Sequence, residues 1–108
     1  MPQTRAFEWL LKIFRIMPKI LIVGKFIFLL FSSDVAETRR HIHVEMRKNR
    51  RRRVAKFWLE PHIELVEPGN LNEREIQMAI SLIEENQRLI DEQLDRFYSG
   101  RVLKVLRK

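Results

Sequence analysis

The chain has 108 residues, of which 45% are hydrophobic and 32% are charged, and this balance predicts a single folded domain over residues 1–108. It contains no cysteine, which excludes disulfides and thiolate zinc sites and is typical of proteins of the reducing cytoplasm. The net charge of +7 is uneven, because residues 1–60 carry 14 basic and 5 acidic side chains whereas residues 61–108 carry 7 and 9.

The first third of the chain predicts a short helix and two strands. Residues 5–17 have the pattern of an amphipathic helix, with an apolar stripe opposite a basic face. The longest uncharged run that follows, residues 26–33, falls far short of the roughly 20 residues that span a membrane, so we expect no transmembrane segment. Residues 19–23 and 26–32 instead predict strands joined at Gly24-Lys25, the second apolar on both faces and therefore buried on both.

Residues 39–61 are predicted to form a β-hairpin. Its turn centres on Asn49-Arg50, because asparagine tolerates the left-handed backbone conformation. Side chains alternate between the two faces of a strand, and a slip of one residue would turn the apolar set outward. The outward pairs are His41 with Trp58 and His43 with Lys56, and the inward pairs are Ile42 with Phe57 and Val44 with Ala55.

The remainder of the chain is predicted to contain a short strand, a turn, one long helix and a basic tail that frays. Asn72 and Glu75 form a capping-box pattern at the start of the helix. Its apolar stripe has one break, at Gln87. The strand, turn, helix and tail cover residues 62–66, 67–70, 73–98 and 99–108.

The histidine pair on the hairpin is the candidate for acid–base chemistry. Histidine titrates near neutral pH, and cleavage of RNA by attack of a 2′-hydroxyl needs a base, an acid and cations beside the phosphate. His41 and His43 are the candidate base and acid, with Lys56 as a cation. The candidate nucleic-acid-binding residues are Arg39, Arg40, Arg50, Arg51, Arg52, Arg53 and Trp58, whose indole offers a base a stacking surface. The alternative is that both histidines are solvated strand residues that help to cover Trp58, since no nucleophile or carboxylate dyad completes the constellation.

A metal site is a second interpretation of the same histidines. Two histidines two residues apart on a strand can share a metal, and His62 is a third nitrogen ligand if its strand lies alongside. The set His41, His43 and His62 indicates no particular metal, and we expect no cofactor. The arginine run suits an acidic protein surface as well as RNA, so a protein partner remains an alternative.

Five motifs carry a family resemblance. They are Met17-Pro18-Lys19-Ile20-Leu21, Gly24-Lys25-Phe26 leading to Phe31-Ser32, His41-Ile42-His43-Val44, Ala55-Lys56-Phe57-Trp58-Leu59-Glu60-Pro61, and the capped helix with Ile83-Glu84-Glu85-Asn86. Over residues 17–98 the chain resembles the small prokaryotic domain of unknown function 4160 family. Because that family starts near Met17, residues 1–16 are expected to be an N-terminal extension, unless Met17 is the true start. The resemblance implies a component of a two-gene toxin–antitoxin-type operon, encoded beside another small protein.

We therefore expect an α+β fold with an antiparallel sheet of four to five strands, one long C-terminal helix and a short N-terminal helix. The leading functional hypothesis is a cytoplasmic toxin–antitoxin-type component that acts on or binds RNA through the hairpin face, as an endoribonuclease if the histidines are catalytic. The alternative is a non-catalytic interaction module. It would form a homodimer, or bind a small antitoxin-like partner, through residues 26–31 and the acidic helix.

Overall fold

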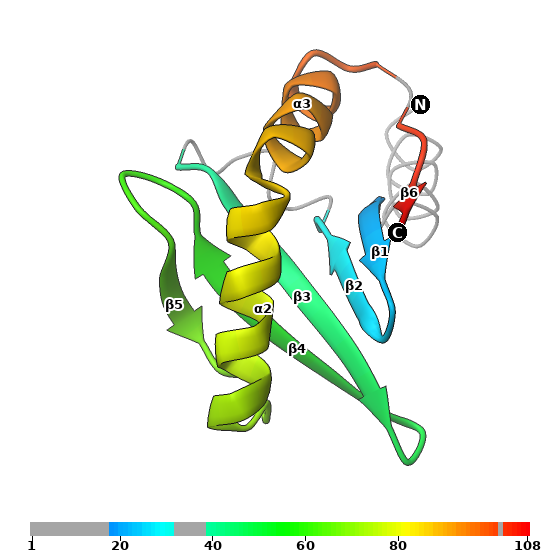
Figure 1. Ribbon diagram of the computed structural model, residues 1–108. Helices are drawn as coiled ribbons and strands as arrows, with labels where there is room; N and C mark the ends of the chain where they lie inside the picture. Colours follow the sequence, from blue (N-terminus) through cyan, green and yellow to red (C-terminus); the bar gives the residue numbers. More distant parts are fainter. Residues whose placement is uncertain (1–17, 32–38, 102) are drawn as a thin grey trace, which may run out of the picture.

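The computed structural model describes residues 18–31, 39–101 and 103–108, which form an α+β fold with one sheet and two helices (Figure 1). The expected N-terminal helix at residues 5–17 lies outside these ranges, as does the extension at residues 1–16. The strands are β1 (Lys19–Val23), β2 (Phe26–Leu29), β3 (His41–Lys48), β4 (Arg51–Trp58), β5 (Glu64–Glu67) and β6 (Leu106–Arg107). The helices are α2 (Glu73–Glu85) and α3 (Gln87–Tyr98).

The six strands form one mixed sheet in the order β5-β4-β3-β2-β1-β6, with β6 parallel to β1 and the other neighbours antiparallel. The expectation of a purely antiparallel sheet of four to five strands with a frayed tail is therefore wrong. The tail returns to the edge of β1, where the N–H of Lys108 donates to the carbonyl of Ile22 at 2.9 Å. Buried Gln93 anchors it, since its amide donates to the carbonyls of Ile20 at 3.1 Å and Lys104 at 2.6 Å.

The two strands predicted before the hairpin are confirmed as β1 and a shortened β2. Glycine at position 24 has a φ of +56°, as the turn between them requires. β2 lies within the sheet and is buried in the core of the chain itself, with Phe26 5% exposed and Phe28 fully buried. The apolar residues 26–31 are therefore largely buried, as the pattern of this strand predicts.

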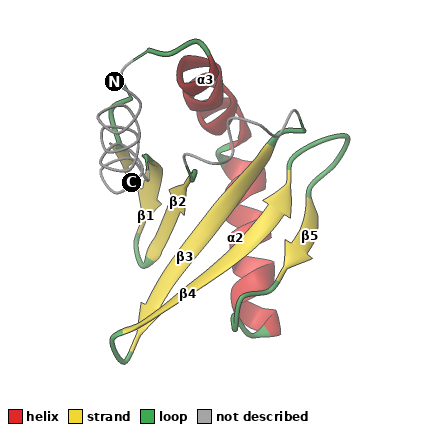
Figure 2. Ribbon diagram, turned by 180° about the vertical axis from the view of Figure 1, so that it is seen from behind, coloured by secondary structure: helices red, strands yellow, loops and turns green. Residues whose placement is uncertain are grey.

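Both helices cover the same face of the sheet (Figures 1 and 2). Their apolar stripes close a single core against β1–β4, as the period of the sequence predicts. The fully buried side chains at its centre include Phe28, Ile42, Val44, Ala55, Phe57, Ala79, Ile83 and Leu94. The core includes Ile42 and Val44 of β3 and Ala55 and Phe57 of β4, so it fixes the half of the hairpin that lies away from the turn.

The predicted long helix over residues 73–98 is interrupted at Asn86. This residue has φ −114° and ψ 18°, outside the helical range, and is only 3% exposed. Its side-chain amide donates to the carbonyl of Leu82 at 2.8 Å, so the side chain competes with the backbone for that acceptor. The chain changes direction there, and α3 turns away from the axis of α2 (Figure 1).

The turn before α2 packs against β4. Gly69 has a φ of +53°, and a Cβ at this position would overlap the carbonyl oxygen of Val54, so the close approach requires glycine. The capping box that follows is confirmed. The Asn72 side chain accepts from the Glu75 N–H at 2.8 Å, and the Glu75 carboxylate accepts from the Asn72 N–H at 2.9 Å. The start of α2 is thereby fixed beside β4.

Candidate nucleic-acid interface

The β3–β4 hairpin has the predicted register. His41 pairs with Trp58 and His43 with Lys56, and the turn residues Asn49 and Arg50 have φ values of +53° and +63°. Two successive residues with positive φ are the signature of a type I′ turn, whose twist matches the strands. The sequence therefore predicts both the position of the turn and every cross-strand pair that follows from it.

The end of the hairpin projects beyond the rest of the sheet (Figure 1). The β2–β3 ladder ends at the pair Ile27–Glu45, and the β4–β5 ladder begins at Lys56. In the part of the chain that the structure describes, residues 46–53 thus form a two-stranded ribbon without a third strand. We call residues 46–53 the hairpin tip.

The hairpin tip places like charges opposite one another. Arg47 pairs with Arg52 and Lys48 with Arg51 across the ladder, and Arg50 lies in the turn. Directly opposed like charges destabilise an antiparallel pair. Glu45 lies beside both Arg47 and Arg52. No ion pair among the described residues involves Lys48 or Arg51, so the second pair is the one expected to cost folding stability.

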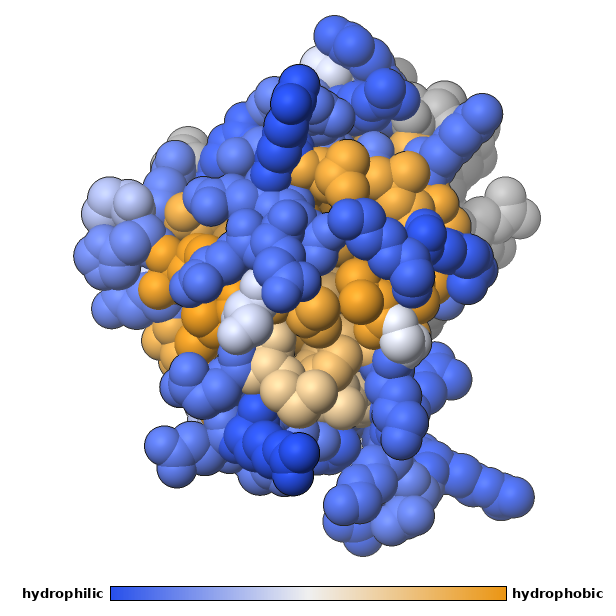
Figure 3. Space-filling view, viewed as in Figure 1, coloured by the Kyte–Doolittle hydropathy of each residue, from blue (hydrophilic) through white to orange (hydrophobic). Residues whose placement is uncertain are grey.

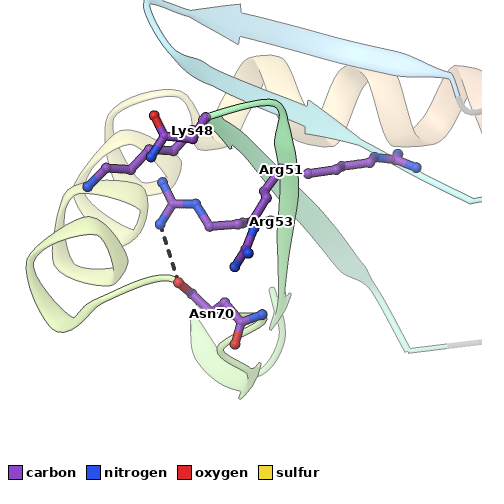
Figure 4. Close-up of a pocket in the computed structure, with 6 residues that line it drawn as sticks. Lys48, Arg51, Arg53 and Asn70 are labelled. Carbon is purple, nitrogen blue, oxygen red and sulfur yellow. Dashed lines mark hydrogen bonds between the residues drawn. The ribbon is translucent and has the colours of Figure 1, made fainter.

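Sequence reasoning missed Arg47 and Lys48 as candidate contacts. The predicted register contained the signal, because it sets both residues opposite members of the arginine run. Lys48, but not Arg47, borders a hollow of about 900 Å³ beside the hairpin tip (Figure 4). The residues that line it are Lys48, Asn49, Arg51, Arg52, Arg53 and Asn70.

Arg53 anchors the hairpin tip to α2. Its guanidinium binds Glu75 with two hydrogen bonds of 2.8 and 2.9 Å and reaches the carbonyl of Asn70 at 3.3 Å (Figure 4). The hydrogen bonds from Arg53, followed by the one from the Asn72 N–H, lower the pKa of Glu75 to about 2. The same interaction raises the pKa of Arg53. This arginine serves the fold as well as lining the hollow.

A buried carboxylate lies under the other side of the hairpin tip. The side chain of Glu45 is 3% exposed and forms an ion pair with the Arg52 guanidinium, and the Arg47 Nε lies 3.5 Å from its second oxygen. Arg50 and Arg51 are exposed, and no hydrogen bond or ion pair within the described ranges involves either side chain. The hairpin tip therefore keeps a strong positive excess after its internal ion pairs are formed.

The face that carries His41 and His43 is buried, so the expectation of an outward face is wrong. His41 is fully buried and His43 is 8% exposed. The Phe31 ring centroid lies 4.2 Å from that of His43, and the two imidazole centroids are 5.6 Å apart in an edge-to-face arrangement. His41 Nδ1 donates to the Arg39 carbonyl at 2.9 Å. Alternation separates the faces of a strand but does not reveal which face is covered.

Trp58 is half-buried, and cations contact its ring. The Arg39 guanidinium lies 4.4 Å and the Lys56 amine 4.7 Å from the ring centroid. Arg39 also donates to the Glu60 carbonyl at 2.9 Å and lies 3.6 Å from the Glu64 carboxylate. A base that stacks on this indole, as the sequence predicts, meets a ring already engaged in cation–π contacts.

Arg40 points to α3 and lies apart from the hairpin tip. Its guanidinium forms an ion pair with Asp95 and lies 3.6 Å from the Asp91 carboxylate. The backbone N–H of Arg40 donates to the Glu60 carboxylate at 3.1 Å. The hydrogen bond to Asp95 raises the pKa of Arg40. The structure therefore does not group Arg40 with the arginines of residues 50–53.

The structure does not assemble the alternative metal ligands His41, His43 and His62. His62 is exposed and precedes β5, which begins at Glu64 rather than at the predicted residue 62. Within residues 18–31, 39–101 and 103–108, no three histidine, cysteine or acidic side chains group as metal ligands do.

The comparison with known proteins identifies one family. The model of a domain of unknown function, DUF4160, matches residues 26–94. The chain belongs to this family. The DUF4160 match runs from β2 into α3, so it contains the whole hairpin tip and the turn that packs against β4. No curated protein and no solved structure matches the chain. Of the two described helices, neither α2 nor α3 is long and apolar enough to cross a membrane.

Proposed function

We propose that this DUF4160 chain is the RNA-binding component of a toxin–antitoxin-type pair and that it binds the phosphate backbone through the hairpin tip. The observation that carries the proposal is the pairing of Arg47 with Arg52 and of Lys48 with Arg51. Glu45 offsets the repulsion of the first pair, while the second pair has no carboxylate partner among the described residues and is expected to cost folding stability in the free protein. An anion bound between the strands would relieve the repulsion, so binding and charge placement are linked.

The geometry of the hairpin tip suits a polyanion. The ribbon projects from the sheet, and its exposed cations lie on both strands and in the turn. Lysine and arginine that neutralise phosphates release condensed counterions, which supplies affinity without base recognition. The hairpin tip itself carries no carboxylate, but Glu45 beside it pairs with Arg52 and Glu75 binds Arg53 from α2.

The proposal concerns binding rather than cleavage. Contact with the hairpin tip needs no access to His41 or His43, which are 0% and 8% exposed. A ribonuclease activity would need the scissile phosphate to reach these rings and Lys56. Binding therefore follows from surfaces that are open in the structure, whereas cleavage requires a rearrangement.

Anisotropy titration with labelled single-stranded RNA tests the proposal. We expect Arg50→Gln/Arg51→Gln to weaken binding by about tenfold at low salt, because two exposed phosphate contacts are lost. The matched control is Arg96→Gln/Arg101→Gln, which removes two exposed arginines, one in the last turn of α3 and one just after it. Figure 1 shows α3 at the end of the molecule opposite the hairpin tip. Equal affinity in both variants would refute the proposal. If the wild type binds an acidic polypeptide as tightly as RNA, the hairpin tip has no preference for RNA, and a protein partner becomes the better proposal.

A further inference from the structure

The outer face of α2 carries an unusual row of side chains. At about 100° per residue, Arg74, Met78, Ser81 and Glu85 fall within an arc of about 60° on the helix. We call these four residues the α2 seam. It lies opposite the core positions Ala79 and Ile83 on the helix, and Met78 is 46% exposed.

The surface around the α2 seam is apolar and hollowed. A hollow of about 560 Å³ lies between the seam and the β1–β2 turn, and its apolar lining includes Phe26 and Met46. A second, of about 340 Å³, lies on the other side and includes Gln77 and Ser81. Met78 borders both hollows. Figure 3 shows tan and orange atoms between blue ones on the face that α2 covers.

The spacing and charges of the α2 seam fit a second copy of the same helix. Its members are separated by four, three and four residues, the spacing with which paired helices meet. In an antiparallel pair about a two-fold axis, Met78 of each copy faces Ser81 of the other, where the smaller hollow accepts it. The same register sets Arg74 of each copy against Glu85 of the other. A parallel pair would instead oppose identical charges.

We propose that the α2 seam is a homodimer interface in which two copies of α2 pack antiparallel. Each two-fold contact then has an apolar centre and an ion pair at each end, and the helix dipoles oppose favourably. α2 has 13 residues and is about 20 Å long, so the seam covers less than the roughly 1,200 Å² of a standard interface. The dimer is therefore weak and depends on protein concentration. This proposal is independent of RNA binding by the hairpin tip.

A charge-swap series tests the interface by analytical ultracentrifugation over about a hundredfold range of concentration. We expect the wild type to dimerise, and Arg74→Glu and Glu85→Arg each to weaken dimerisation by about tenfold or more, since each places like charges in both end pairs. Arg74→Glu/Glu85→Arg together should restore the dimer, because the pairs re-form with reversed sign. The control Arg96→Glu makes the same charge change on α3, outside the seam, and should dimerise as the wild type does.

The substitutions near the ends of α2 are not expected to destabilise the fold. A glutamate near the start of α2 and an arginine near its end both suit the helix dipole, so both single variants should unfold no more readily than the wild type. Loss of the dimer with an intact fold would support the seam. A wild type that stays monomeric overturns the proposal and leaves the surface to a partner of another sequence. A dimer that both single swaps leave unchanged also overturns it.

Discussion

Replacing Gly69 with alanine is expected to destabilise the fold by more than the cost of a positive φ alone, because the added methyl group also meets β4. The position has a φ of +53°, which disfavours any residue with a Cβ. The added methyl group would also overlap the carbonyl oxygen of Val54 and lie 3.1 Å from the Ala55 nitrogen. These are backbone atoms of β4, so relief requires the turn to move away from the strand. That movement would carry Asn70 away from Arg53.

Gly24 supplies a matched control. Its φ of +56° is almost the same, but no heavy atom lies within 4 Å of a Cβ built there. Gly24→Ala should therefore cost about 1–2 kcal/mol from the backbone conformation alone. Gly69→Ala should cost that amount plus about 1–3 kcal/mol for the displaced turn, comparable to overpacking a core.

Urea unfolding of the two variants measures the difference directly. The midpoint should fall further for Gly69→Ala than for Gly24→Ala with an unchanged slope, and the thermal midpoint should fall by about 5 °C for each kcal/mol. Equal losses in the two variants would show that the turn does not press on β4. In that case the account of how Asn70 reaches the hollow would be wrong.

Three further changes test the supports of the site. Because the pKa of Glu75 is lowered from 4.5 to about 2, its carboxylate stabilises the fold above pH 4.5, and this contribution is lost as the pH falls towards 2. In unfolding titrations, Glu75→Gln should therefore reduce the loss of unfolding free energy over this pH range. An unchanged pH dependence would contradict the pairing of Glu75 with Arg53. Gln93→Ala should lower the free energy of unfolding by about 1–3 kcal/mol, because it releases the tail that forms β6. Hydrogen exchange of the Lys108 N–H should become faster. Unchanged exchange would show that other contacts hold the strand. His41→Gln/His43→Gln should leave the RNA affinity unchanged in anisotropy titrations, because both rings are buried away from the hairpin tip. Cleavage of labelled RNA that persists in EDTA and disappears in this variant would instead make the histidines catalytic.

The hairpin register was predictable because local patterns determine it. Asn49 marks the turn, and the alternation of apolar residues then leaves one pairing in which Ile42 and Phe57 share a face. The capping box of Asn72 and Glu75 was predictable for the same reason, since it involves residues three apart. Each of these predictions depends on neighbours in the sequence.

Two of the errors concern the packing of distant parts of the chain, and a third is local. β6 forms because the tail meets the edge of β1 about 85 residues earlier, and its own sequence carries no strong strand pattern. His41 and His43 lie on the predicted side of the strand, yet both side chains are buried, which alternation along the strand does not reveal. The helix break at Asn86 left a trace in the stripe at Gln87, but it depends on a side chain that binds a carbonyl one turn earlier.

The arginine run illustrates how the fold divides residues of one type. Arg53 faces α2 and pairs with Glu75, Arg52 faces buried Glu45, and the turn leaves Arg50 and Arg51 exposed. From the sequence alone the four side chains are equivalent. The ladder and the turn before α2 decide which of them remain open to an anion.

The salt dependence of RNA affinity tests the central claim most directly. The slope of log affinity against log salt reports the number of phosphates that the protein neutralises, at about 0.7 for each contact with a single strand. We predict that Arg50→Gln/Arg51→Gln lowers this slope by about 1.4, while Arg96→Gln/Arg101→Gln leaves it at the wild-type value. A slope that is the same in all three proteins would contradict binding through the hairpin tip.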